Sequence, residues 1–148
     1  LGEAMHRTLE WHRPGQPLDT QPLRHALASQ YRLTEEQVDT VLQRAQAILQ
    51  GEGAWVWDAA QLDWQANEVD IAWQGRTLRI DRLVRQKTPG GAPPIWWVLD
   101  FKSALDSNAQ DTLRNQLADY REAVMRLHPQ ETVRAAFLTA QGKLVEPQ

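Results

Sequence analysis

Apolar residues recur every three to four positions along the first third of the chain, a spacing that predicts helices. Two short helical stretches cover residues 3–12 and 23–31. A stronger pattern follows, in which Thr34 and Gln37 are spaced as a capping box and Gly51 marks the end. The apolar stripe of this third stretch consists of Val38, Val41, Leu42, Ala45, Ile48 and Leu49. The sequence therefore predicts two short helices and then one long helix.

After Gly51 the pattern changes to one that is typical of β-strands, separated by turn-forming residues. Strand-like segments cover residues 54–57, 68–73, 76–85 and 95–101. Residues 95–99 are apolar on both faces, which indicates a central strand. A helix over residues 108–127 and a strand over residues 132–140 complete the chain. The predicted order of the core takes three strands from these four segments: helix, three strands, helix and strand, preceded by a small helical section.

Length and composition indicate one globular domain. The chain has 148 residues, of which 42% are hydrophobic and 24% charged. We expect a single domain over residues 1–148, with an N-terminal helical section (residues 1–33) and a core (residues 34–148). Since the chain begins with Leu1 rather than Met, we expect a piece cut from a longer polypeptide. The mean hydropathy is −0.56 and no apolar run suits a membrane span, so we expect a soluble, cytoplasmic protein.

Cysteine usage and charge narrow the possible functions. The chain has no cysteine, which excludes a disulfide framework, a thiolate nucleophile and a cysteine-bound iron–sulfur cluster. The net charge of −3 argues against a nucleic-acid binder held by overall positive charge. Residues 76–87 are nevertheless rich in basic side chains. Strand alternation places Arg79 and Arg85 on the face of Asp81, where they contact a DNA phosphate or balance the acidic residues; both interpretations stay open, and Arg82 is a third candidate for DNA contact.

The candidate chemistry lies at the end of the most apolar strand. Asp100 and Lys102 emerge on one face there, because side chains alternate along a strand. An isolated Asp-x-Lys triplet is most often a strand-end ion pair. Asp81, however, lies within the preceding apolar strand, where a carboxylate is costly to bury without a partner. If the two strands are neighbours, Asp81, Asp100 and Lys102 converge, and a divalent cation is a suitable partner. A glycosidase pair is disfavoured, since the lysine would suppress the raised pKa of a general acid.

Five short motifs occur together in one order. They are Gly2-x-x-x-His6, Glu68, Gly75-x(5)-Asp81-Arg82-Leu83, Val98-Leu99-Asp100-Phe101-Lys102-Ser103 and Gln116-x-x-x-Tyr120. This set resembles the RecB-type nuclease domain of the PD-(D/E)XK superfamily. The resemblance spans most of the chain, and it implies a restriction-endonuclease-like α/β core of αβββαβ order, in which helices flank a central mixed sheet.

The resemblance also implies roles for individual residues. His6, Asp81, Asp100 and the backbone carbonyl of Phe101 would bind Mg²⁺ or Mn²⁺. Lys102 would position or activate the attacking water and stabilise charge on the phosphate. Three further residues would lie at or near the site: Glu68 as an accessory acid, with Gln116 and Tyr120 on the helix that follows. Phosphodiester hydrolysis suits such a site, because it needs a deprotonated water and a neutralised phosphate.

The function that the resemblance implies is a metal-dependent DNA exonuclease domain of the AddA/RecB branch, acting in DNA end processing, repair and recombination in a bacterial cytoplasm. Attached UvrD-like, ATP-dependent helicase domains would deliver single strands of DNA, and an AddB/RecC-like second subunit is a possible partner. The absence of cysteine separates the chain from the branch that carries an iron–sulfur cluster. Two alternatives stay open: an inactive nuclease-like module that holds DNA or docks a subunit, and a stand-alone restriction-type endonuclease.

Overall fold

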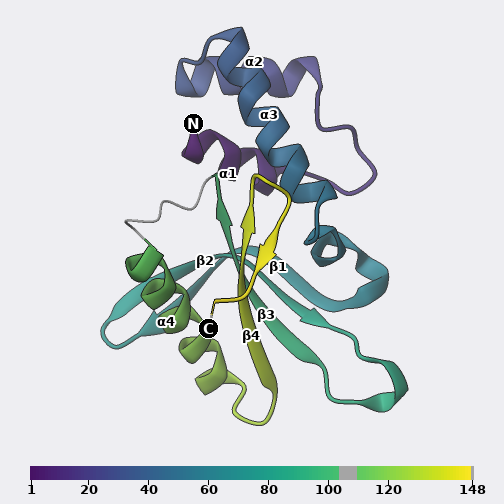
Figure 1. Cartoon of the computed structure of the whole chain (residues 1–148), viewed down its shortest axis with the longest axis vertical. Coiled ribbons are helices and arrows are strands. Elements are labelled where there is room, and N and C mark those ends of the chain that lie inside the picture. Colours follow the sequence, from purple (N-terminus) through teal and green to yellow (C-terminus); the bar gives the residue numbers. More distant parts are fainter. Residues whose placement is uncertain (104–109, 148) are drawn as a thin grey trace.

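A computed structural model describes residues 1–103 and 110–147 (Figure 1). This part of the chain has an α/β fold with a five-stranded mixed sheet and four α-helices. The helices are α1 (Gly2–Trp11), α2 (Gln21–Tyr31), α3 (Glu35–Gln50) and α4 (Gln110–Leu127). The strands are β1 (Leu62–Trp73), β2 (Arg76–Gln86), β3 (Ile95–Lys102), β4 (Thr132–Thr139) and β5 (Leu144–Val145). Three 3₁₀ turns join them: η1 (Ala54–Trp57), η2 (Ala59–Gln61) and η3 (Pro89–Gly91).

The strands lie in the order β1-β2-β3-β4-β5. The pairs β1/β2, β2/β3 and β4/β5 are antiparallel, whereas β3 and β4 are parallel and are connected through α4. Six of the eight residues of β3 are buried, because both of its faces are covered. This confirms the prediction of a central strand from its continuous apolar pattern.

Two hydrophobic clusters cover the two faces of the sheet. On one face, α1, α3 and η1 pack on alternate residues of the central strands, among them Val84, Leu99 and Phe101. On the other face, α4 packs through Leu117, Tyr120, Ala123 and Val124 on the intervening residues. The sheet thus lies between α1 and α4. Side chains from both layers can therefore contribute to a site at the end of β3.

The pairing of β2 with its neighbours changes at Asp81, and we call this position the fork of β2. Its pairing with β3 begins at Arg82, opposite Leu99, and continues to Gln86. On its other side β2 pairs with β1 at Ile80 and at Arg82, but the intervening Asp81 has no pair on β1. Glu68, which faces this position, has a positive φ of 49°. Because the ladder opens here, backbone N–H groups become available to side chains.

Most sequence-predicted elements are confirmed, and the capping box of Thr34 and Gln37 is present. The prediction of a strand over residues 54–57 is wrong, since this segment is the 3₁₀ turn η1. The alternating tryptophans imitate a strand, whereas close contact with β4 enforces a turn: a Cβ at Gly53 would lie 2.4 Å from Leu138 Cδ2. The predicted start of α4 at residue 108 lies outside the described residues. Within those residues, the helices are too short or too polar to cross a membrane.

Candidate metal centre

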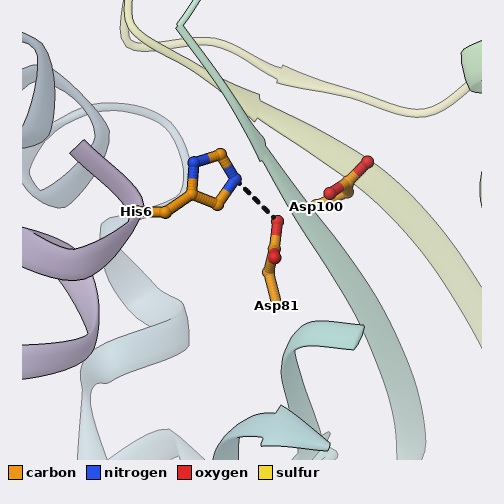
Figure 2. A group of neighbouring side chains, drawn as sticks. All are labelled: His6, Asp81 and Asp100. Atoms are coloured by element: carbon orange, nitrogen blue, oxygen red, sulfur yellow. Dashed lines mark hydrogen bonds and ion pairs between the residues drawn. The ribbon is translucent and has the colours of Figure 1, made fainter. Parts of the chain in front are cut away.

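Three side chains from different elements meet at the fork of β2 (Figure 2). His6 comes from α1, Asp81 from β2 and Asp100 from β3. One potential ligand atom from each lies within 4.8 Å of the other two. Opposite ligands of a six-coordinate Mg²⁺ are about 4 Å apart, so the three atoms need only small shifts to share one ion. The structure thus brings together the three side chains that the sequence predicted as metal ligands.

His6 is oriented by hydrogen bonds from both ring nitrogens. Nδ1 donates to the carbonyl of Gly2 at 2.8 Å, and Nε2 lies 3.2 Å from Asp81 Oδ2. Burial opposes a positive charge on the ring, but the hydrogen bond and charge of Asp81, the carbonyl of Gly2 and the charge of Asp100 together raise the pKa of His6 to about 9. The Nδ1 hydrogen bond leaves Nε2 as the nitrogen that faces the site, which is the arrangement found in histidine ligands of metals.

Asp81 occupies the position where the ladder opens. Its Oδ2 accepts a hydrogen bond of 2.8 Å from the backbone N–H of Phe101 on the neighbouring strand. Burial acts to raise the pKa of Asp81, but hydrogen bonding with His6 and Asp100, the charge of His6 and the backbone N–H of Phe101 lower it below its usual range. Asp81 is therefore an ionised carboxylate held in place by a ring and a peptide group.

Asp100 is the more strained of the two carboxylates. Its side chain is 8% exposed, and Lys102 Nζ lies 3.2 Å from its Oδ2. Apart from this ion pair, the buried oxygen has no hydrogen-bond partner among the described residues. Burial and the adjacent Asp81 raise the pKa of Asp100, with Lys102 acting against them. A buried, incompletely satisfied oxygen beside a second carboxylate favours a bound cation, so the residues present fit a divalent metal ion.

The other predicted site residues lie at different distances from this cluster. Tyr120 is buried, and burial together with the charges of Asp100 and Asp81 raises its pKa, which places its hydroxyl in the field of the site. Gln116 Nε2 donates to the Tyr120 hydroxyl at 2.8 Å. Glu68 is exposed and faces Asp81 across the sheet, outside the group of three ligands. Gln116 and Tyr120 on α4 thus lie next to the three ligands, whereas Glu68 lies at the exposed edge of the site.

The arginines of β2 differ from their sequence-predicted placement. Arg82 is 3% exposed and donates to Val56 O, Asn67 Oδ1 and Gln65 Oε1, so the prediction that it contacts DNA is wrong. Arg85 lies beside Trp96 in the layer of α4, not on the face of Asp81. The reason is that strand alternation lapses at the fork, where Asp81 and Arg82 both face the layer of α1 and η1.

Arg79 remains a candidate for contact with DNA. It is exposed and forms an ion pair with Asp70 at 2.9 Å, and the charge of Glu10 on α1 acts on it. It therefore lies in the layer of Asp81, as alternation predicts.

Comparison with known proteins adds no identification. No protein-family model matches the chain, and no curated protein matches it. Among solved structures, one described as "Crystal structure of SSO0001" is similar over 98% of this chain and 74% of that chain, with 16% sequence identity and a TM-score of 0.33. A TM-score of this size carries no argument about fold or function.

Proposed function

We propose that this chain is a metal-dependent DNA nuclease domain of the RecB type with a PD-(D/E)XK core. The observation that carries the proposal is the meeting of His6, Asp81 and Asp100 at the fork of β2, with the ammonium of Lys102 3.2 Å from Asp100. Two carboxylates beside an imidazole and an ammonium suit the hydrolysis of a phosphodiester by a metal-bound water.

The side chains of His6, Asp81 and Asp100, with the backbone carbonyl of Phe101, would hold Mg²⁺ or Mn²⁺. A bound ion of this kind lowers the pKa of its water and neutralises charge on the phosphate. The donor set of one nitrogen and several oxygens is more suited to Mg²⁺ or Mn²⁺ than to a thiophilic metal.

Lys102 and Tyr120 would complete the site. Lys102 is half-buried and held by Asp100, so its ammonium can orient a water and offset negative charge that develops on the phosphate. Tyr120 and Gln116 approach from the opposite layer and form one hydrogen-bonded unit, which would contact the scissile phosphate or an adjacent one.

The substrate and the partners belong to the same proposal. The overall charge of −3 gives little general attraction to DNA, which suits a domain that receives single strands from attached ATP-dependent helicase domains. A second, AddB/RecC-like subunit and a bacterial, cytoplasmic setting follow from the resemblance in the motifs, as do exonuclease activity and a role in double-strand break repair.

The test compares the purified chain with three variants on end-labelled single- and double-stranded linear DNA, with Mg²⁺ or Mn²⁺. Asp100→Ala and Lys102→Ala should each lower the rate by at least about 100-fold, because each removes a group that acts on the transition state. Asp119→Ala serves as the control, since Asp119 is a carboxylate on α4 that only pairs with Arg76 at the surface. Melting curves verify that each variant is folded.

A wild-type rate that equals the rates of Asp100→Ala and Lys102→Ala with both metals would contradict the proposal for the isolated chain. The same assay on the protein with its helicase domains attached then decides between a nuclease that needs delivered DNA and an inactive module that holds DNA or docks a subunit. Loss of activity in Asp119→Ala as well would show that the assay reports folding rather than chemistry.

A further inference from the structure

A column of stacked groups leads from the interior to the candidate metal centre. The guanidinium carbon of Arg82 lies 5.1 Å from the centre of the Trp57 ring. Trp57 in turn stacks on Phe101 with ring centres 5.9 Å apart and an angle of 24°. Phe101 meets the ring of His6 at 5.9 Å in a tilted arrangement. The column therefore ends on a ligand of the centre.

The position of Trp57 is set by backbone contacts on both sides of η1. Val56 O accepts hydrogen bonds from Arg82 Nε and Nη2 at 3.1 and 2.8 Å. At the other end, η1 starts from Gly53, whose close approach to Leu138 leaves no space for a side chain. The turn is thereby fixed to β2 and to β4 at once, so the indole ring has little freedom to move.

Phe101 connects Trp57 to the residues of the candidate metal centre. Its ring is 2% exposed and lies against Trp57 and His6. Its backbone N–H donates to Asp81 Oδ2, and its carbonyl belongs to the proposed ligand set. A change in the packing of Phe101 would therefore act on the imidazole of His6 through the ring and on Asp81 through the peptide group.

We propose that Trp57 is a positioning residue for the divalent-cation centre, acting through the ring of Phe101. The inference rests on the proposed function, because it assigns Trp57 to the same site. Aromatic rings in an offset stack hold one another in a defined orientation better than an aliphatic side chain does. Groups that hydrogen-bond to metal ligands typically contribute about 10- to 100-fold to metal affinity, and for a residue that holds a ligand by packing we expect the lower end of this range, which is measurable without any catalytic assay.

Trp73 offers a matched control for the loss of a buried indole. It is 7% exposed against 8% for Trp57, and both indole N–H groups lack a hydrogen-bond partner among the described residues. Trp73 also lies under an arginine, with Arg126 4.9 Å from its ring centre. It belongs to the cluster on the α4 layer, whereas Trp57 belongs to the cluster that contains Phe101. The two residues thus differ chiefly in their relation to the centre.

The experiment measures Mn²⁺ binding by calorimetry or electron paramagnetic resonance for the wild type, Trp57→Leu, Trp57→Phe and Trp73→Leu. We expect Trp57→Leu to weaken Mn²⁺ binding by at least about tenfold. Trp57→Phe keeps a ring against Phe101 and should restore most of the affinity. Trp73→Leu should lower the melting temperature as Trp57→Leu does, since both lose a buried indole, yet bind Mn²⁺ as the wild type does.

The outcomes separate the inference from the proposed function. A wild type that binds no Mn²⁺ contradicts the proposed function. Wild-type affinity in Trp57→Leu, or equal weakening in Trp57→Leu and Trp73→Leu, overturns the positioning role alone. If Trp57→Leu does not fold, Trp57→Met and Trp73→Met replace the two leucine variants, and the same outcomes decide.

Discussion

Asp81 and Arg82 are neighbours in β2 and both carry a charge away from solvent, but their surroundings differ. Arg82 directs its donors to a backbone carbonyl and two amide oxygens, and no carboxylate among the described residues pairs with it. Burial accordingly lowers the pKa of Arg82 to about 10. Asp81 lies instead beside a second carboxylate, Asp100, one of whose oxygens lacks a hydrogen bond.

Neighbouring residues of one strand thus differ in role: Arg82 holds the fold together, whereas Asp81 belongs to the candidate metal centre. A buried charge whose hydrogen-bonding groups are all satisfied holds the chain together, and its removal costs stability. Two carboxylates side by side in a buried site repel each other, and His6 and Lys102 offset this repulsion only in part, since the pKa of Asp100 is still raised. We therefore expect substitutions at Arg82 to act mainly on stability, and substitutions at Asp100 to act mainly on ligand binding.

The largest stability effect should come from Arg82→Met, measured by urea unfolding without metal. The substitution keeps an apolar stem of similar length but leaves Val56 O, Asn67 and Gln65 without their donor. We expect the free energy of unfolding to fall by about 2–4 kcal/mol. Arg79→Met is the control, because Arg79 forms an exposed ion pair with Asp70, and such a pair contributes little to stability. Equal losses in the two variants would mean that the burial of Arg82 has no structural role.

Asp100→Asn and Asp81→Asn should have smaller effects on stability, opposite in sign to each other, in metal-free protein at pH 8. Asp100 has a raised pKa, so its ionised form destabilises the fold at this pH; the amide removes that cost and should raise the melting temperature by about 2–4 °C. Asp81 has a lowered pKa, so its ionised form stabilises the fold, and Asp81→Asn should lower the melting temperature by a similar amount.

The pH dependence sharpens the same contrast. As pH falls below the raised pKa of Asp100, the wild type protonates this carboxyl, and the advantage of Asp100→Asn should disappear by about pH 5. An advantage that is constant between pH 5 and pH 8 would show that the amide acts through packing. A loss of stability in Asp100→Asn at pH 8 would contradict the view of Asp100 as a strained group.

The helices and the central strands were predictable because their signals are local. The apolar stripe and the capping box of α3 lie within sixteen residues, and the continuous apolar run of β3 reflects burial on both faces. The segment around Trp57 was not predictable, since alternating tryptophans suit a strand and only contact with β4 and Arg82 makes them a turn. The polar first half of β1 was missed for a related reason: Gln65 and Asn67 are there to accept hydrogen bonds from Arg82.

The candidate site, too, was predictable from the sequence only in part. Asp81, Asp100 and Lys102 could be placed together from strand alternation and adjacency of strands alone. The face of each arginine could not, because alternation fails at the fork, and the fork depends on where β3 separates from β2 and on the unpaired Asp81 between two β1 pairs. The role of Trp57 also depends on a contact between segments 44 residues apart. Long-range packing is therefore what the sequence pattern leaves undetermined.

A second carboxylate pair provides the smallest and most specific test of the contrast between satisfied and unsatisfied charges. Glu10 on α1 lies near Glu68, and burial together with the hydrogen bond and charge of Glu68 raises the pKa of Glu10 to about 7, with Arg7 and Arg79 acting against them. The folded protein thus keeps this proton to a higher pH than the unfolded chain does. Stability should therefore decrease as pH rises from about 4.5 to 7.

Glu10→Gln should remove this part of the pH dependence. The melting temperature of the variant, relative to that of the wild type, should rise between pH 5 and pH 8, by less than the shift expected for Asp100→Asn because Glu10 is closer to solvent. Loss of the ion pair with Arg7 adds only a small offset, which changes little across this range. Glu3→Gln, in the first turn of the same helix, is the control for a glutamate at the surface. A difference in melting temperature between Glu10→Gln and the wild type that does not change with pH would show that Glu10 and Glu68 do not share a proton. The contrast with Arg82 would then depend on the pair Asp81 and Asp100 alone.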